Sequence, residues 1–265
     1  MMDQPGPRPL RVAPSPRPGE HPPVRRSRRG VALLPSLFTL GNLFCGYACV
    51  IYAMRGEFET AAPFIGIAVV LDMLDGRIAR LTGTASEFGV QFDSMADIIS
   101  FGMAPAVLTF AWGLSTLGRL GWAAAFLFVT AAALRLARFN IQAASADKRY
   151  FVGMPSPAAA GILASTVYAY PEGLVQFRSS LPAIPLVVVP ALLMVSTVRF
   201  RSFKTIDLQA RRPFRVLIFF AALLTVIATH PQSVLVVISY GYLVSPLIET
   251  IVMRLRRKPA APPAG

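Results

Sequence analysis

Residues 72–97 read DMLDGRIARLTGTASEFGVQFDSMAD, and this stretch decides the fold. Two of its aspartates, Asp72 and Asp75, lie near the end of one long apolar segment, and Asp93 and Asp97 lie near the start of the next. An ionised carboxylate at bilayer depth is costly, so such residues mark functional sites by default. Four of them close together need a strong positive charge among them, and a divalent metal ion is the natural candidate.

The composition is that of a membrane protein. Of the 265 residues, 54% are hydrophobic and only 15% are charged, and the mean hydropathy is +0.56. A soluble domain carries about 25% charged residues. The apolar residues come in blocks of roughly 17 to 25, long enough to cross a hydrocarbon core about 30 Å thick. We therefore predict an all-α fold, a polytopic integral membrane helix bundle of about eight transmembrane helices.

The expected spans form one membrane domain, residues 31–254, with its motif core at residues 72–97. Residues 1–30 are rich in Pro and Arg and cannot bury enough apolar surface to fold, so we expect a disordered basic cytoplasmic tail. Residues 255–265 form a second basic cytoplasmic tail. The eight spans are expected at residues 34–54, 61–82, 88–114, 119–141, 156–172, 181–198, 214–230 and 233–253.

The positive charges predict an orientation in the membrane. The net charge is +13, but the basic residues border the apolar blocks, which argues against nucleic acid as a partner. With a cytoplasmic N-terminus and eight spans, 23 of the 26 Lys and Arg residues face the cytoplasm, and only Arg55, Arg119 and Arg178 face the other side. This distribution satisfies the positive-inside rule. We predict a protein of the cell (inner) membrane with both termini cytoplasmic.

The four aspartates are spaced to converge. Asp72 and Asp75 are three residues apart, and Asp93 and Asp97 are four apart, so each pair shares one helix face. The loop between the two helices is short, which brings the faces together. Small residues continue both faces and leave room for a ligand against the backbone; they are Gly76, Ala79 and Gly89.

This set of oxygen ligands suits Mg²⁺ or Mn²⁺, with positions left open for phosphate oxygens. Two ions about 4 Å apart can clamp both ends of a phosphoryl displacement. Arg80 lies one turn beyond Gly76 and can donate two hydrogen bonds to phosphate. In the alternative interpretation, Arg77 and Arg80 are interfacial arginines. The aspartates themselves could instead form an ion-paired seam, although two arginines cannot neutralise four carboxylates, or line a cation or proton pathway.

The complete motif, Asp-x2-Asp-Gly-x2-Ala-Arg-x8-Gly-x3-Asp-x3-Asp, resembles the signature of the CDP-alcohol phosphotransferases. These integral membrane enzymes transfer a substituted phosphoryl group from a CDP-activated donor to an alcohol. The flanking sequence is similar to the phosphatidylserine synthase branch of that family, and the resemblance runs from about residue 31 to 205. The stretches that carry it are residues 34–46, 80–89, 93–105, 135–140, 153–161 and 194–204.

The resemblance implies a reaction and roles for the aspartates. Asp72, Asp75 and Asp93 would hold metal, and Asp97 would act as general base and also face a second metal ion. The phosphatidyl group of CDP-diacylglycerol would pass directly to the hydroxyl of L-serine, giving phosphatidylserine and CMP. Members of the family are homodimers, so we expect a homodimer in the lipid bilayer.

The remaining site residues are assigned to the two substrates. For the CDP group we expect Gly76, Ala79, Arg80, Thr84, Gly89, Thr39 and Asn42. For Thr39 and Asn42, hydrogen bonding inside the bundle is the alternative. Serine carries a carboxylate, so its pocket needs basic or polar partners, for which we expect Arg138, Asn140, Arg135 and Lys204. The alternative for the basic residues of this set is that they only orient the chain in the membrane.

Two rival functions follow from the same residues. The enzyme could transfer the same phosphatidyl group to another acceptor, such as glycerol 3-phosphate or inositol phosphate. A phosphorylated acceptor would need a pocket with more basic residues. The chain could instead be a divalent-cation or proton-coupled transporter. Transporters show inverted repeats or broken helices. The chain has no clear internal repeat, and the half of the spans away from the aspartates is apolar, so the transferase is favoured.

Overall fold

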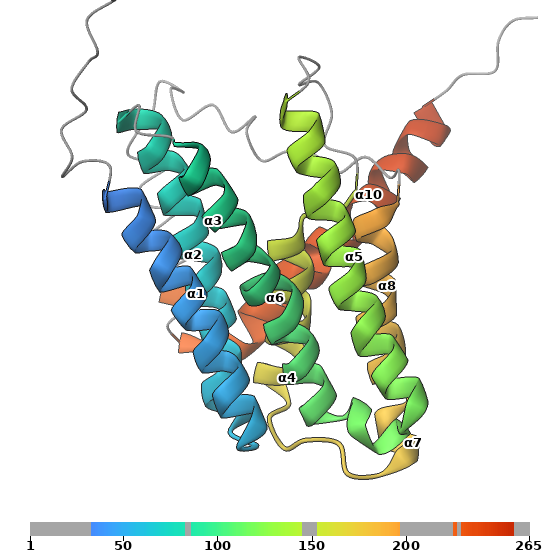
Figure 1. The fold of residues 1–265 in the computed structure, drawn as a ribbon. Coiled ribbons are helices and arrows are strands. Elements are labelled where there is room, and N and C mark those ends of the chain that lie inside the picture. The colour runs from blue at the N-terminus through green and yellow to red at the C-terminus, as the bar shows by residue number, and fades with distance from the viewer. Residues whose placement is uncertain (1–32, 83–85, 145–152, 197–224, 227–228, 257–265) are drawn as a thin grey trace, which may run out of the picture.

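The computed structural model describes residues 33–82, 86–144, 153–196, 225–226 and 229–256. All regular secondary structure within these residues is helical (Figure 1). The first half contains α1 (Leu33–Met54), α2 (Phe58–Thr82), α3 (Glu87–Asp97), the π-helix η1 (Ile98–Met103), α4 (Ala104–Trp112), the 3-10 helix η2 (Leu114–Leu117) and α5 (Arg119–Ala144). The second half contains α6 (Ser156–Ala169), α7 (Phe177–Ser180), α8 (Ala183–Val195) and α10 (Pro231–Arg256).

In the part of the chain that the structure describes, four helical stretches are long and apolar enough to cross a membrane, which agrees with the predicted membrane helix bundle. They are Ser36–Met54, Glu87–Trp112, Arg119–Ile141 and Phe177–Val195. Helix α2 is 25 residues long but carries the charged motif, and α6 has only 14 residues. Pro231–Ser245 of α10 is a shorter apolar helix.

The expected span boundaries agree closely with several helices. The spans predicted at 34–54, 61–82 and 119–141 lie inside α1, α2 and α5. Helix α6 ends at Ala169, three residues before the expected end of that span. Most of the expected span 214–230, the N-terminal tail and residues 257–265 of the C-terminal tail lie outside the described residues, and residues 255 and 256 belong to α10.

Helix α3, η1 and α4 form one continuous rod that includes the second half of the motif (Figure 1). Pro105 has no N–H to donate, so an unbroken α-helical ladder cannot cross this junction. Just before it, the N–H of Ala104 donates to the carbonyl of Ile99, five residues back. A π-turn of this kind inside an α-helix is frequently found at functional sites. Here it begins directly after Asp97.

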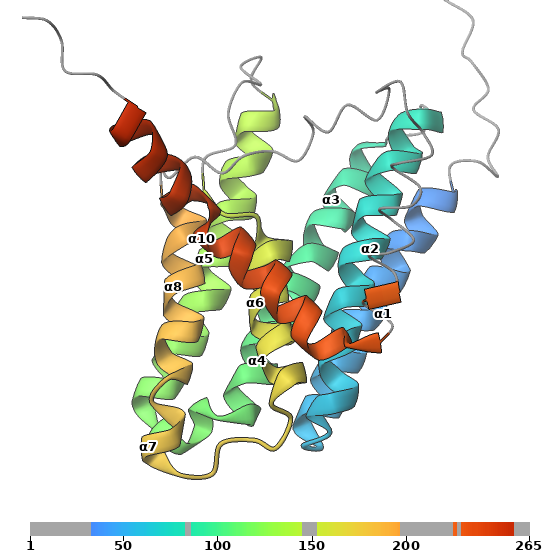
Figure 2. The same cartoon turned by 180° about the vertical axis from the view of Figure 1, so that it is seen from behind.

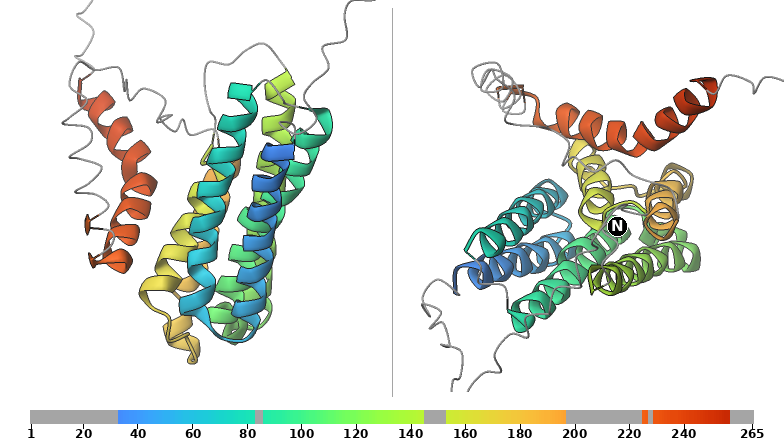
Figure 3. Two further views of the ribbon diagram at one scale, coloured as in Figure 1. Left: turned by 90° about the vertical axis from the view of Figure 1, so that its left-hand side faces the viewer. Right: turned by 90° about the horizontal axis from the view of Figure 1, so that it is seen from above.

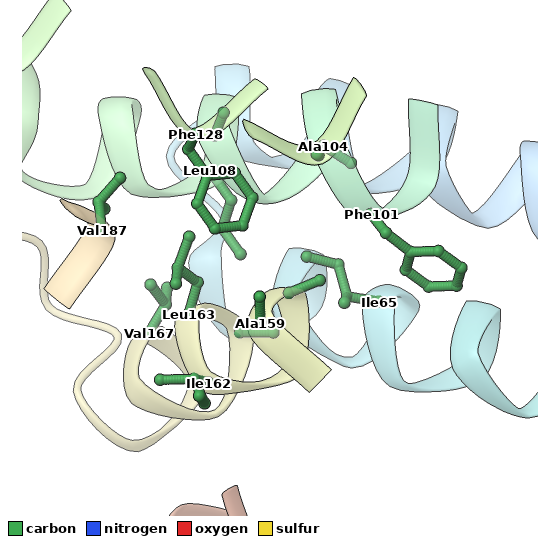
Figure 4. Close-up of a cluster of buried hydrophobic side chains, with 14 of the residues drawn as sticks. Ile65, Phe101, Ala104, Leu108, Phe128, Ala159, Ile162, Leu163, Val167 and Val187 are labelled. Atoms are coloured by element: carbon green, nitrogen blue, oxygen red, sulfur yellow. The ribbon is translucent and has the colours of Figure 1, made fainter. Parts of the chain in front are cut away.

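The buried core lies where α2, the rod, α5, α6 and α8 meet (Figure 4). Small residues on α6 let neighbouring helices approach closely, as in other membrane helix bundles. Side chains of this core include Ile65, Phe101, Ala104, Leu108, Phe128, Ala159, Ile162, Leu163, Val167 and Val187.

Helix α1 crosses the π-helix at a very short distance. A Cβ atom on Gly46 would lie 2.6 Å from the hydroxyl oxygen of Ser100, so only glycine permits this approach. The Ser100 hydroxyl donates to the backbone carbonyl of Asn42 at 2.9 Å. The crossing therefore fixes the position of α1 along the axis of the rod. It lies one helical turn after the motif aspartate Asp97 in the sequence.

The residues just before α6 pack closely against the end of α8. Gly153 has φ +91°, which a side chain would strain, and a Cβ there would lie 2.5 Å from the carbonyl oxygen of Met194. The N–H of Met154 donates to the carbonyl of Leu193 at 3.0 Å. Pro155 and Pro157 then open α6, where proline is well tolerated.

Helix α10 lies outside the main bundle and crosses α6 obliquely (Figures 2 and 3). The hydroxyl groups of Tyr240 and Thr166 are 3.0 Å apart and join the two helices. Tyr242 and Leu243 also pack against the core. The last helix is therefore attached to the bundle through α6.

Candidate active site

Three of the four motif aspartates meet at one point between α2 and α3. One carboxylate oxygen from each of Asp72, Asp75 and Asp93 lies within 4.8 Å of the others. Asp75 is buried, with 3% of its surface exposed, and the other two are half-buried. The convergence predicted from the helical spacing is therefore present in the fold.

The chemistry of these three carboxylates fits a divalent cation. Oδ1 of Asp93 is buried and has no hydrogen-bond partner among the described residues. Within the same residues, no Lys or Arg forms a salt bridge with any of the three. Three like charges in a partly buried site repel one another, and a hard cation such as Mg²⁺ or Mn²⁺ relieves that repulsion.

Asp97 lies beside this cluster and has its own support from α1. The side-chain Nδ2 of Asn42 donates to Oδ1 of Asp97 at 3.2 Å. Asn42 is completely buried, and its Oδ1 has no partner among the described residues. Asp97 is close enough to Asp72 and Asp93 to feel their charges. The hydrogen bond from Asn42 thus orients the Asp97 carboxylate beside the three carboxylates that could hold a metal ion.

Thr39 supports the cluster from the same face of α1, one turn before Asn42. Its hydroxyl donates to Oδ2 of Asp75 at 3.1 Å in a buried environment. The sequence placed Thr39 and Asn42 at the CDP group. The structure shows both as hydrogen-bond donors to motif carboxylates, and their contact with CDP stays a prediction.

Among the described residues, Arg135 is a basic side chain close enough to the acidic groups to interact with them electrostatically. It lies on α5, partly buried, within electrostatic range of Asp97 and Asp72. Its Nη1 donates to the hydroxyl of Ser156, the first residue of α6, at 2.9 Å. One of the four residues predicted for the acceptor therefore lies within electrostatic range of the carboxylates.

Two other acceptor candidates lie on the same end of α5 and make different contacts. Arg138 is exposed, and its Nη1 donates to the carbonyl of Val195, the last residue of α8, at 3.3 Å. Asn140 donates through Nδ2 to the hydroxyl of Ser94, which lies next to Asp93 on α3, at 3.1 Å. Asn140 therefore reaches the rod, whereas Arg138 reaches the end of α8.

The remaining predicted residues are placed only in part. Gly76 and Gly89 are half-buried on α2 and α3, and the N–H of Gly89 donates to the hydroxyl of Ser86, which caps α3, at 3.0 Å. Ala79 and Arg80 belong to α2, but their side chains lie outside the described part of the chain, as do Thr84 and Lys204 altogether.

Sequence reasoning missed two polar residues around the site. Ser100 donates to the backbone carbonyl of Asn42, and Ser156 accepts a hydrogen bond from Arg135. The only signal for either serine was its place in a stretch that carries the resemblance, 93–105 for Ser100 and 153–161 for Ser156. Nothing else in the local pattern distinguishes them from other polar residues of an apolar helix.

Comparison with known proteins identifies the class to which this fold and site belong. The family described as CDP-alcohol phosphatidyltransferase matches residues 32–198, which include α1 to α8 and all four aspartates. This match covers more than half of the chain, and the chain belongs to that family.

Individual relatives carry a more specific name. A "CDP-diacylglycerol--serine O-phosphatidyltransferase" of Helicobacter pylori (strain J99 / ATCC 700824) is 36% identical over 229 residues, covering 84% of this chain and 93% of the relative. Proteins of the same name from Mycobacterium leprae (strain TN) and Bacillus subtilis (strain 168) are 42% and 33% identical, and cover 51% and 52% of this chain and 47% and 76% of their own lengths.

The Thr39 hydrogen bond can be tested with a matched pair of variants. Thr39→Val keeps the shape but cannot donate to Asp75, and Thr39→Ser keeps the hydroxyl. Losing a hydrogen bond to a metal ligand costs roughly 10- to 100-fold in metal affinity or activity. We therefore expect Thr39→Val to need a higher Mn²⁺ concentration for half-maximal transferase rate, whereas Thr39→Ser stays near the wild type. Equal Mn²⁺ requirements in both variants would show that the hydroxyl does not support the cluster.

Proposed function

We propose that the protein transfers the phosphatidyl group of CDP-diacylglycerol to the hydroxyl of L-serine, giving phosphatidylserine and CMP. Two lines of support meet here. The chain belongs to a family of CDP-alcohol phosphatidyltransferases, and relatives that cover most of it are named as serine O-phosphatidyltransferases. The observation that carries the proposal is the convergence of Asp72, Asp75 and Asp93 beside Asp97.

The three converging aspartates are the residues that would hold a Mg²⁺ or Mn²⁺ ion. Bound there, the ion would neutralise phosphate oxygens and the charge that develops during phosphoryl transfer. We further propose a second ion, with Asp97 facing it.

Asp97 is proposed as the general base. Asn42 binds its Oδ1 and thereby orients the carboxylate, which leaves Oδ2 to accept a proton. In the proposed step, Asp97 takes the proton from the serine hydroxyl while the serine oxygen forms a bond to the phosphorus of the phosphatidyl group. The bond from that phosphorus to CMP breaks, and CMP leaves with the electron pair. Proton removal by a positioned base contributes about 10²- to 10⁴-fold to such a reaction.

The substrate assignments follow the geometry around the aspartates. For the CDP group we propose Gly76, Ala79, Arg80, Thr84 and Gly89, with Thr39 and Asn42 reaching it from α1. The unpartnered Oδ1 of Asn42 supports this part because it can accept a hydrogen bond from a ligand. For serine we propose Arg135, Arg138, Asn140 and Lys204. Arg135 has the strongest support, since it lies within range of Asp97 and Asp72.

The proposal extends to the membrane arrangement. We propose eight spans in the cell (inner) membrane, with both termini and the aspartate site on the cytoplasmic side, in a homodimer. One membrane domain at residues 31–254 lies between basic tails at 1–30 and 255–265. The four long apolar helices and the distribution of basic residues support this arrangement.

The orientation can be tested by labelling single cysteines from one side of the membrane. The native Cys45 and Cys49 are buried and should not react with a membrane-impermeant maleimide. In intact spheroplasts we expect Glu172→Cys, in an exposed loop, to be labelled, and Thr84→Cys to be labelled only after the membrane is opened. The reverse pattern, or labelling of both from the same side, would contradict the eight-span arrangement.

The activity can be tested by CMP release from CDP-diacylglycerol by purified protein in detergent, with Mn²⁺ or Mg²⁺. We expect metal-dependent release with L-serine, and not with glycerol 3-phosphate or inositol phosphate. Asp97→Asn keeps the size of the side chain but cannot act as base, so kcat should fall by about 10²- to 10⁴-fold with little change in KM for the lipid.

A matched acid-to-amide change controls for the loss of charge. Glu172→Gln alters an exposed residue in the loop before α7 and should leave the rate at the wild-type value. Release with a phosphorylated acceptor in place of serine would show that serine is not the acceptor. An active Asp97→Asn variant would show that Asp97 is not the general base.

A further inference from the structure

Ser156 holds Arg135 at one place in the bundle. Nη1 of Arg135 on α5 donates a hydrogen bond to the hydroxyl of Ser156, the first residue of α6, at 2.9 Å. Ser156 is buried, with 4% of its surface exposed. A guanidinium group has five N–H donors. Since Ser156 binds through one nitrogen of the group, other N–H donors of Arg135 can bind a ligand.

The backbone that carries Ser156 is itself fixed against α8. Two residues before Ser156, the N–H of Met154 donates to the carbonyl of Leu193 at 3.0 Å. At Gly153 the approach is so close that a Cβ atom would lie 2.5 Å from the carbonyl oxygen of Met194. The start of α6 therefore cannot follow a moving side chain, and the Ser156 hydroxyl is a fixed acceptor for Arg135.

Two contacts set the register of α5 against the rod formed by α3, η1 and α4, which runs antiparallel to it (Figure 1). A Cβ atom on Gly102 would lie 3.3 Å from the Cβ of Ala132, so η1 and α5 lie close together here. Asn140 lies eight residues after Ala132, and Ser94 lies eight residues before Gly102. Nδ2 of Asn140 donates to the hydroxyl of Ser94 at 3.1 Å. The equal spacing on both sides shows that the register is kept from one contact to the other.

This register places Arg135 beside the proposed base. Arg135 lies three residues after Ala132, which is about 4.5 Å along a helix axis, and is therefore level with about Ile99 of the rod. Asp97 lies two residues from that level. The electrostatic influence of Asp97 and Asp72 on Arg135 agrees with this position. An anion bound to the free donors of Arg135 would therefore lie at the level of the proposed base.

We propose that Ser156 is a positioning residue for the acceptor: its hydroxyl holds one arm of the Arg135 guanidinium so that the other N–H groups bind the carboxylate of an amino-acid acceptor. The inference rests on the proposed transfer to serine and deepens it, because it assigns the start of α6 a role in acceptor binding. A guanidinium fork matches a planar carboxylate through two parallel hydrogen bonds. A fork that is already held by one arm loses less conformational freedom when the ligand binds.

The test compares two serine-to-alanine variants of α6. Ser156→Ala removes the hydrogen-bond partner of Arg135. Ser165→Ala removes a similarly buried hydroxyl, which is 5% exposed as a residue and donates to the carbonyl of Ile162 in the same helix at 3.1 Å. CMP release is measured with serine varied at a fixed CDP-diacylglycerol concentration, and with CDP-diacylglycerol varied at saturating serine.

The expected change is selective for serine. KM for serine should rise about 10-fold in Ser156→Ala, as for the loss of one hydrogen bond to a charged group. In the same variant kcat and KM for CDP-diacylglycerol should stay at wild-type values, and Ser165→Ala should resemble the wild type throughout.

The two substrates separate the possible roles of Arg135. A rise in KM for CDP-diacylglycerol without a rise for serine would mean that Arg135 binds a phosphate of the donor, and would overturn the inference. Equal effects of Ser156→Ala and Ser165→Ala would mean that Ser156 has only a structural role. An unchanged KM for serine in Ser156→Ala would refute the inference alone. No release by the wild type with serine would instead refute the proposed function.

A double-mutant cycle tests whether Ser156 acts through Arg135. Arg135→Lys keeps the positive charge but replaces the planar fork by a mobile ammonium group. We expect Arg135→Lys to raise KM for serine, and Ser156→Ala to have little further effect in that background. The same rise for Ser156→Ala in both backgrounds would show that Ser156 does not act through Arg135.

A second variant guards against loss of folding. The melting temperature of each purified variant in detergent is measured beside its kinetics. If Ser156→Ala does not fold, Ser156→Cys fills the same place with a thiol, which is only a weak hydrogen-bond acceptor. It should raise KM for serine selectively in the same way. A wild-type KM for serine in folded Ser156→Cys would overturn the proposed positioning of Arg135.

Discussion

The structure depends on the cost of placing four carboxylates inside an apolar helix bundle. Charged groups in such surroundings are stable only when a partner compensates them. The fold brings Asp72, Asp75 and Asp93 together, although their mutual repulsion opposes this. A divalent cation bound there would compensate all three at once and would remove the repulsion that otherwise destabilises the bundle.

The other features around the site serve this arrangement. Thr39 and Asn42 on one face of α1 donate hydrogen bonds to Asp75 and Asp97. The positions of Thr39 and Asn42 relative to the aspartates are set where α1 crosses the π-helix, because Gly46 allows the close approach of Ser100. The π-helix begins at Ile98, so the irregular backbone starts at the residue after the proposed base, Asp97. Support of this kind is typical of residues that orient metal ligands rather than contact the metal.

Much of the bundle could be predicted from the sequence, because apolar length and helical spacing are local properties. The spacing of the aspartates predicted their shared faces, and the short loop predicted their convergence. Contacts between distant segments could not be predicted in this way. The hydrogen bond from Asn42 on α1 to Asp97, and the hydrogen bond from Arg135 on α5 to Ser156 on α6, depend on how helices cross, which one-dimensional periodicity does not encode. The π-turn was missed as well, although Pro105 was a sign that the helix could not continue regularly.

The most direct test of the account is a titration of the purified protein in detergent with Mn²⁺, followed by electron paramagnetic resonance of the free ion. Asp75 is the most buried of the three clustered carboxylates, so Asp75→Asn is the decisive variant. The account predicts saturable Mn²⁺ binding by the wild type that is strongly weakened in Asp75→Asn and unchanged in Glu172→Gln. Equal binding by all three proteins, or none by the wild type, would contradict the claim that the aspartates form a metal site.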